Sequence, residues 1–78
     1  MSDYRVSIKS SARRSNGAVG QFVHINGAQT VFPDRDAADE WAAELAANGD
    51  RGVWIRDANP GDASADGYLM GRVRFRDD

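Results

Sequence analysis

One amphipathic helical segment stands among several short segments with strand-like patterns, and this combination restricts the fold more than any other feature. Apolar side chains recur at i, i+3, i+4 and i+7, as Ala38, Trp41, Ala42 and Leu45. This is the spacing of one helix face. Asp34 or Asp36 can cap the start of the helix, and the pattern ends at about Asn48. We therefore predict one helix with a single apolar face.

Five segments have the pattern of strands. Residues 4–9 alternate strictly between apolar and polar side chains, as a half-buried strand does. Residues 21–25 and 28–32 flank Asn26-Gly27, a dipeptide typical of a type I′ hairpin turn. Residues 53–57 and 68–76 complete the set. The polar, glycine-rich residues 10–20 and 58–67 between them predict loops, the first of them flexible.

Strands grouped around one helix predict the α+β class. We expect a two-layer sandwich of βββαββ order, in which the amphipathic helix packs on a mainly antiparallel sheet. A chain of 78 residues has room for one core, so residues 1–78 form one small domain. That core is thin, because 12 of the 32 apolar residues are alanine. Without cysteines for disulfides, oligomerisation is the remaining means of stabilising so small a scaffold, and the expected partner is either another protein or, in a homodimer, a second copy of the chain.

The charge of the chain is segregated along the sequence. Residues 1–30 carry a net charge of +3, residues 31–66 carry −6 and residues 67–78 carry +1, which sum to −2. No uncharged apolar stretch approaches the ~20 residues needed to cross a bilayer, and the N-terminal residues have no apolar signal segment. These features predict a cytoplasmic protein with no membrane contact.

Nine arginines accompany a single lysine, and the acidic residues are mostly aspartate. This composition is typical of haloarchaeal or actinobacterial proteins. The segments VFPDRDAADEWAAEL, VWIRDANPGD and DGYLMGR resemble small haloarchaeal proteins of unknown function, over roughly residues 20–72. The resemblance implies a compact α+β domain with no established activity, and it assigns no functional residue.

The sequence gives little basis for catalysis. It has one histidine, no cysteine and none of the motifs of serine hydrolases, phosphate-binding loops or zinc peptidases. His24 could act as a general base only beside a carboxylate or a serine, and a structural or surface role is the favoured interpretation. We therefore predict a protein that is not an enzyme, with no catalytic residues and no cofactor.

Two short patterns suggest ligands but have simpler explanations. Carboxylate and amide side chains gather in residues 57–66, yet their spacing lacks the glycine and glutamate positions of a calcium-binding loop. We therefore predict a solvated turn and no metal site. Residues 17–20 spell G-x-x-G, which contacts phosphates in some RNA-binding domains. Between two predicted strands this motif indicates an ordinary loop.

The sheet face opposite the helix is the most informative part of the predicted fold. Alternation along the strands places large aromatic and cationic side chains on that face. The candidate binding face consists of Phe22, His24, Trp54, Arg56, Tyr68, Met70, Arg72, Arg74 and Arg76, near Arg5 and Lys9. One helix cannot cover both sides of a five-stranded sheet, so this face is either exposed or buried by a partner.

Three interpretations of the face compete. Aromatic residues, methionine and arginine are enriched in protein interfaces, whereas aromatic residues beside arginines also stack and neutralise single-stranded nucleic acids. A plain solvated strand face is the third interpretation. The isoelectric point near 5.2 argues against a dedicated nucleic-acid binder. We therefore predict a protein-interaction or self-association module, with single-stranded nucleic-acid binding as the alternative.

Overall fold

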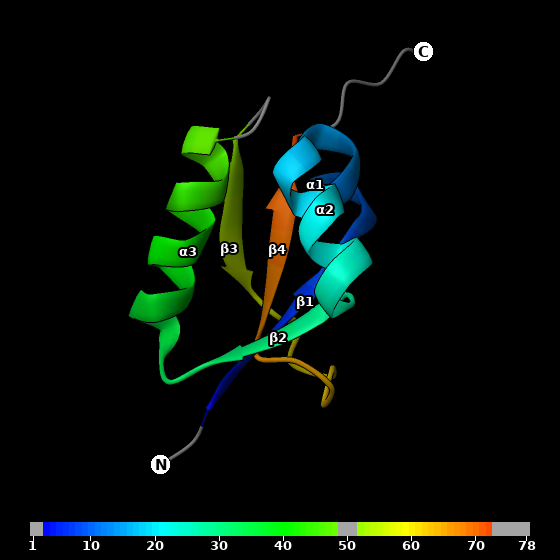
Figure 1. Ribbon diagram of the computed structural model, residues 1–78. Coiled ribbons are helices and arrows are strands. Elements are labelled where there is room, and N and C mark those ends of the chain that lie inside the picture. Colours follow the sequence, from blue (N-terminus) through cyan, green and yellow to red (C-terminus); the bar gives the residue numbers. More distant parts are fainter. Residues whose placement is uncertain (1–2, 49–51, 73–78) are drawn as a thin grey trace.

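The computed structural model describes residues 3–48 and 52–72 (Figure 1). Within them lie four strands and three helices. Their order along the chain is β1 (Tyr4–Ile8), α1 (Ser10–Ser15), α2 (Gly17–Asn26), β2 (Gln29–Phe32), α3 (Arg35–Asn48), β3 (Val53–Asp57) and β4 (Gly67–Gly71).

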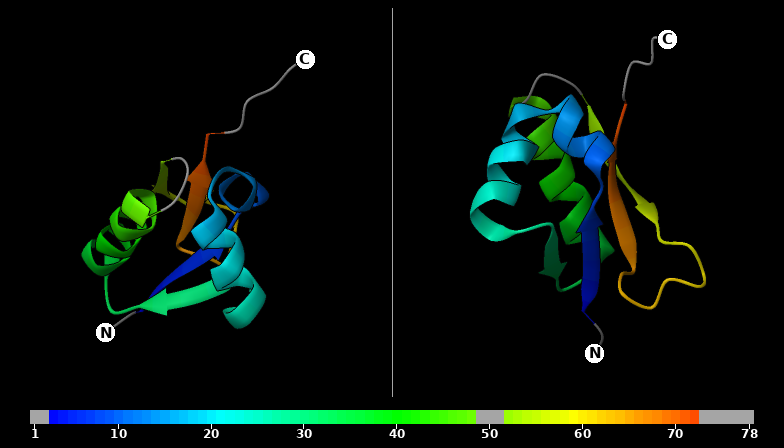
Figure 2. Two further views of the ribbon diagram at one scale, coloured as in Figure 1. Left: turned by 45° about the horizontal axis from the view of Figure 1, so that its top comes forward. Right: turned by 90° about the vertical axis from the view of Figure 1, so that its right-hand side faces the viewer.

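The four strands form one mixed sheet in the order β2-β1-β4-β3. β1 pairs antiparallel with β2 and parallel with β4, and β3 pairs antiparallel with β4. The three helices lie on the same side of β1, β4 and β3, as the right-hand view of Figure 2 shows. One face of the sheet is therefore covered by helices, and the other face is not.

The core lies between the sheet and the helices. Alternate strand residues point toward the helices, so that Ile8, Leu69 and Ile55 lie side by side in the register of the three strands. Small helical residues let the helices approach, because α1 buries Ala12 and α3 buries Ala38 and Ala42. The buried cluster consists of Val6, Ile8, Ala12, Val19, Ala38, Ala42, Val53, Ile55 and Leu69.

The predicted helix is confirmed as α3. The Asp34 carboxylate caps it by accepting a hydrogen bond of 2.9 Å from the backbone N–H of Ala37. Trp41 is half-buried against the core, where its ring centroid lies 5.2 Å from that of Phe22 and 5.0 Å from that of Phe32. The apolar spacing therefore gave the correct face of the helix.

The prediction for residues 10–26 is wrong. The expected flexible loop at residues 10–20 is α1 followed by the start of α2, and the expected strand at residues 21–25 belongs to α2. The predicted hairpin is also wrong, because Asn26 is the last residue of α2 and Gly27 follows it as the C-cap. Gly27 has a φ of 90°, and its backbone N–H donates to the carbonyl of Val23.

Asn16 explains why a second helix begins at this point. Its side-chain oxygen accepts hydrogen bonds from the backbone N–H groups of Ala18 and Val19, so it caps α2. Its side-chain nitrogen donates to the carbonyl of Leu45 on α3, at 2.9 Å. This fully buried residue thus both starts α2 and ties it to the neighbouring helix.

The α+β class is confirmed, but the predicted βββαββ order is not what the structure has. Three helices and four strands replace the single helix and five strands, so the expected two-layer arrangement of one helix on five strands is not confirmed. The last predicted strand extends to residue 71, and its expected continuation over residues 73–76 lies outside the described residues.

The packing of α1 on β4 depends on the absence of a side chain at Gly71. A Cβ atom at this residue would lie 2.8 Å from the Cα atom of Ala12 and 2.8 Å from the carbonyl oxygen of Ser11. Two serines fasten the same contact, since Ser11 accepts from the N–H of Gly71 and Ser15 donates to the carbonyl of Arg72.

Candidate interaction site

The sheet face that the helices leave uncovered is the open sheet face. Its strand residues are those that alternate with the core positions and point the other way. They are Arg5 and Ser7 on β1, Gln29 and Val31 on β2, Trp54 and Arg56 on β3, and Tyr68 and Met70 on β4. Lys9 and Arg72 continue this alternation one residue beyond the ends of β1 and β4.

Trp54 is the main apolar feature of the open sheet face. It lies on an edge strand with 45% of its surface exposed, directly opposite half-buried Met70 in the β3–β4 register. Arg56 and Arg72 are exposed, and neither forms an ion pair with another residue in the described ranges. The face therefore combines an exposed apolar side chain with arginines that form no ion pair among the described residues.

Tyr68, in contrast, does not contribute an exposed ring. Only 5% of its surface is exposed, because the segment of residues 58–66 folds over it. Its hydroxyl donates to the Asp62 carboxylate at 2.6 Å and accepts from the backbone N–H of Asn59 at 3.3 Å. The ammonium of Lys9 lies 4.0 Å from the ring centroid. Tyr68 therefore anchors the loop to the sheet.

The hydrogen bonds around Asp62 hold its pKa at about 2, below the usual 3.8. The side-chain hydroxyls of Ser64 and Tyr68, and the backbone N–H of Ser64, all donate to the carboxylate and stabilise its charged form. The pKa of Tyr68 is raised in turn, because its hydroxyl donates to this charge.

We expect the loop to loosen in acid. A lowered pKa means that the folded state favours the carboxylate, so the stabilisation is complete above pH 3.8 and is lost as the pH falls toward about 2. The protection factor of the Ser64 amide, which is its intrinsic exchange rate divided by the observed rate, should fall over this range, and Asp62→Asn should remove the change. Titration of the Asp62 carboxyl carbon near pH 3.8 in NMR spectra would contradict the expectation.

The predicted binding residues do not all come together. Trp54, Arg56 and Met70 share the open sheet face, whereas Tyr68 lies on it beneath the loop. Arg72 is exposed just beyond the end of β4. The placement of Phe22 and His24 on this face is wrong, because both residues belong to helix α2. Phe22 packs against Trp41 on the helical side. Arg74 and Arg76 lie outside the described residues.

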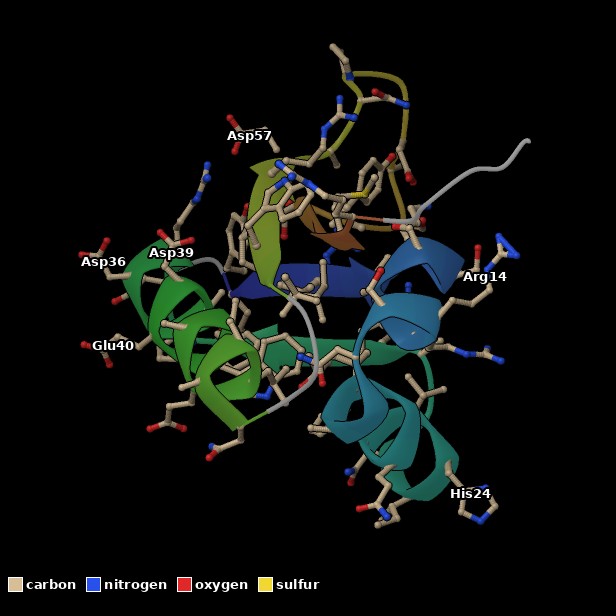
Figure 3. All side chains as sticks on the ribbon, turned by 90° about the horizontal axis from the view of Figure 1, so that it is seen from above. Arg14, His24, Asp36, Asp39, Glu40 and Asp57 are labelled. Carbon is tan, nitrogen blue, oxygen red and sulfur yellow. The ribbon has the colours of Figure 1, made fainter. Side chains whose placement is uncertain are left out.

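The helical side of the molecule carries separated charges that the strand pattern did not reveal. Asp36, Asp39 and Glu40 on α3 lie at one side, and Arg14 and His24 on α1 and α2 lie at the opposite side (Figure 3). Arg35 joins α3 to the outer edge of β3, where it pairs with Asp57 and donates to the carbonyl of Ile55. The α3 carboxylates are exposed, as is Glu44 one turn beyond Glu40.

Within residues 3–48 and 52–72, no three histidine, cysteine or acidic side chains are grouped as a metal ion would require. None of the helices in these ranges is both long enough and apolar enough to span a membrane.

The fold and its exposed face define a small α+β domain with an open mixed sheet. The chain matches, over residues 4–71, the model of a family described as a domain of unknown function, DUF8081, and it belongs to that family. Comparisons with curated proteins and with solved structures found no significant match. Membership of a family of unknown function agrees with the resemblance in the sequence, whereas the haloarchaeal origin stays a prediction.

Proposed function

We propose that this domain is a non-enzymatic association module that binds a second copy of itself through the open sheet face. The observation that carries the proposal is the exposed side chain of Trp54, which lies beside Met70 and near the exposed Arg56 on a face without helices. Tryptophan and arginine are the residues most enriched among those that dominate binding energy in protein interfaces.

Charge complementarity favours a second copy over an unrelated partner. The open sheet face carries the cations Lys9, Arg56 and Arg72, whereas α3 of the same chain exposes Asp36, Asp39, Glu40 and Glu44. α3 is joined to the edge strand β3 through Arg35, so the open sheet face and α3 border the same edge of the sheet. In a two-fold dimer formed at this edge, the sheet face of each copy can lie against α3 of the other, so that both attractive contacts form at once. The apolar centre at Trp54 and Met70 would supply the burial that holds such a pair together at high salt.

Single-stranded nucleic acid is the weaker alternative. Stacking of successive bases needs several exposed aromatic rings along one surface. In the described residues, Trp54 is the one aromatic side chain of the open sheet face that is exposed, because Tyr68 is covered by the loop and Phe22 packs against the core on the helical side. This arrangement gives less support to a base-stacking platform than to a compact protein interface.

Sedimentation or light scattering over about a hundredfold range of protein concentration tests the proposal. We expect a concentration-dependent dimer, and Trp54→Ala should weaken it by about tenfold or more, as loss of a central interface aromatic does. Ile25→Ala is the matched control, because Ile25 is 76% exposed but lies on α2. A wild-type chain that stays monomeric throughout would contradict the proposal, as would equal effects of the two substitutions.

A charge exchange identifies the two surfaces that meet. One double variant, Arg56→Glu with Arg72→Glu, places acidic side chains opposite the acidic α3 of the other copy. A second double variant, Glu40→Arg with Glu44→Arg, places basic side chains opposite the basic sheet face. Each variant alone should therefore remain monomeric. An equimolar mixture restores opposite charges at both contacts, and we expect it to form a mixed dimer. If the mixture stays monomeric, α3 is not the surface that the sheet face contacts.

A further inference from the structure

A pocket on the helical side of the molecule is separate from the open sheet face. It lies where α1 and α2 meet, has a volume of about 450 Å³, and is lined by Arg13, Arg14, Gly20, Val23 and His24. This volume falls within the ~300–1,000 Å³ of small-molecule sites in proteins. Arg13 and Arg14 come from the last turn of α1, and His24 comes from the last turn of α2.

The electrostatics of the pocket favour an anion. Within the described ranges, neither Arg13 nor Arg14 forms an ion pair, and the sequence has no acidic residue from Tyr4 to Pro33. The α3 carboxylates lie at the opposite side of the molecule (Figure 3). Among the described residues the two guanidinium groups therefore have no competing anion nearby, and each of them can donate several hydrogen bonds to a ligand.

The shape of the pocket depends on Gly20. A Cβ atom at this position would meet only the carbonyl oxygen of Arg13, at 3.9 Å, so the residue leaves space rather than a clash. Val23, one turn later on α2, adds an apolar wall beside the cationic groups. This combination suits a ligand with a compact charged group and a small apolar portion.

We propose that this pocket binds a small molecule through a phosphate group. Arginine guanidinium groups match the geometry of phosphate oxygens and bind them through paired, charge-assisted hydrogen bonds. The arginines of α1 hold the phosphate, and Val23 contacts the organic part. The site does not depend on the association proposed for the open sheet face.

Amide NMR titrations with inorganic phosphate and with phenyl phosphate, at matched ionic strength in chloride, test this site. We expect both ligands to shift the amides of Gly20, Val23 and His24. Phenyl phosphate should bind more tightly than inorganic phosphate if the natural ligand is a phosphate ester. The two should bind equally if the natural ligand is free phosphate. Absence of saturable shifts with both ligands would overturn the proposal.

Variants separate a built pocket from general positive charge. Arg13→Gln with Arg14→Gln should weaken binding by about tenfold or more, because charge-assisted bonds are lost. Gly20→Leu keeps both arginines but fills the space, and should also weaken binding by severalfold. The control pair Arg56→Gln, Arg72→Gln changes the net charge equally on the open sheet face and should leave binding unchanged.

Two results would contradict a small-molecule site. If phosphate affinity fell equally in the pocket variants and in the control pair, phosphate binding would depend only on the overall charge of the protein. The second such result is a single-stranded RNA that binds more tightly than phenyl phosphate does. If salt strongly weakened that binding, and if substitution of either arginine pair weakened it too, the arginines would belong to a nucleic-acid surface. Melting curves of each variant establish that it remains folded, so that a loss of binding is not a loss of structure.

Discussion

Trp41→Ala is expected to lower the free energy of unfolding by about 3 kcal/mol, in the range found for large aromatic residues replaced by alanine in cores. Trp41 lies on α3 between the rings of Phe22 on α2 and Phe32 on β2. Its removal therefore leaves a cavity where two helices meet the sheet. Denaturant melts of the wild type and the variant measure the loss.

Trp54→Ala is the matched comparison, because it removes the same side chain from the open sheet face. Trp54 is 45% exposed, so we expect its loss to cost the monomer less than the loss of Trp41 does. The melts must be made at concentrations where both proteins are monomeric. Equal losses for the two tryptophans would mean that Trp54 is part of the core and that the open sheet face is misidentified.

Gly71→Ala should destabilise the protein by about 1–3 kcal/mol, as overpacking in a filled interior does. The new methyl group would lie 2.8 Å from backbone atoms of α1, which cannot move aside as a flexible side chain can. The helix must shift, and the serine hydrogen bonds that join it to β4 must lengthen.

Gly20→Ala is the control for this prediction, and its effect should have the opposite sign. Its methyl group would have room within α2, and alanine favours a helix over glycine by about 0.5–1 kcal/mol. Thermal melts of the two variants should therefore move in opposite directions. A destabilised Gly20→Ala variant, or a Gly71→Ala variant with unchanged stability, would contradict the packing of α1 described above.

The elements with one consistent local signal were predictable from the sequence. The alternation of residues 4–9 and 53–57 corresponds to β1 and β3, and the apolar spacing from Ala38 to Leu45 corresponds to α3. In each segment the periodicity of the apolar residues and the flanking turn residues indicate the same element. The parallel pairing of β1 with β4 had no such local signal, because it joins residues about sixty positions apart.

The helices α1 and α2 were missed because their sequences support two interpretations. The apolar run at residues 22–25 suits a strand, but Val19, Phe22 and Val23 also have the spacing of one helix face. Asn26-Gly27 ends a helix as readily as it turns a hairpin, since both roles use a glycine with positive φ. Contacts with α3 and the sheet, which no short window contains, decide between them.

The candidate site was predictable to the same extent. Strand alternation places Trp54, Arg56 and Met70 on one face of the sheet, as the register of β3 and β4 does. The burial of Tyr68 required knowledge of a loop that folds back through Asp62 and Asn59. The pocket beside Arg13 and Arg14 was not foreseen, since it exists only once residues 10–26 form two helices.

The strand order has a consequence for the path by which the chain folds. β4 is the last strand of the described chain, yet it lies between β1 and β3 and supplies the fully buried Leu69. During synthesis, the β1–β2 pair and the α3–β3 unit are therefore both made before β4, the strand that links β1 to β3 in the sheet. Contacts between residues so far apart slow folding, because the intervening chain must first be ordered. The nascent chain therefore cannot complete its sheet until β4 has been made.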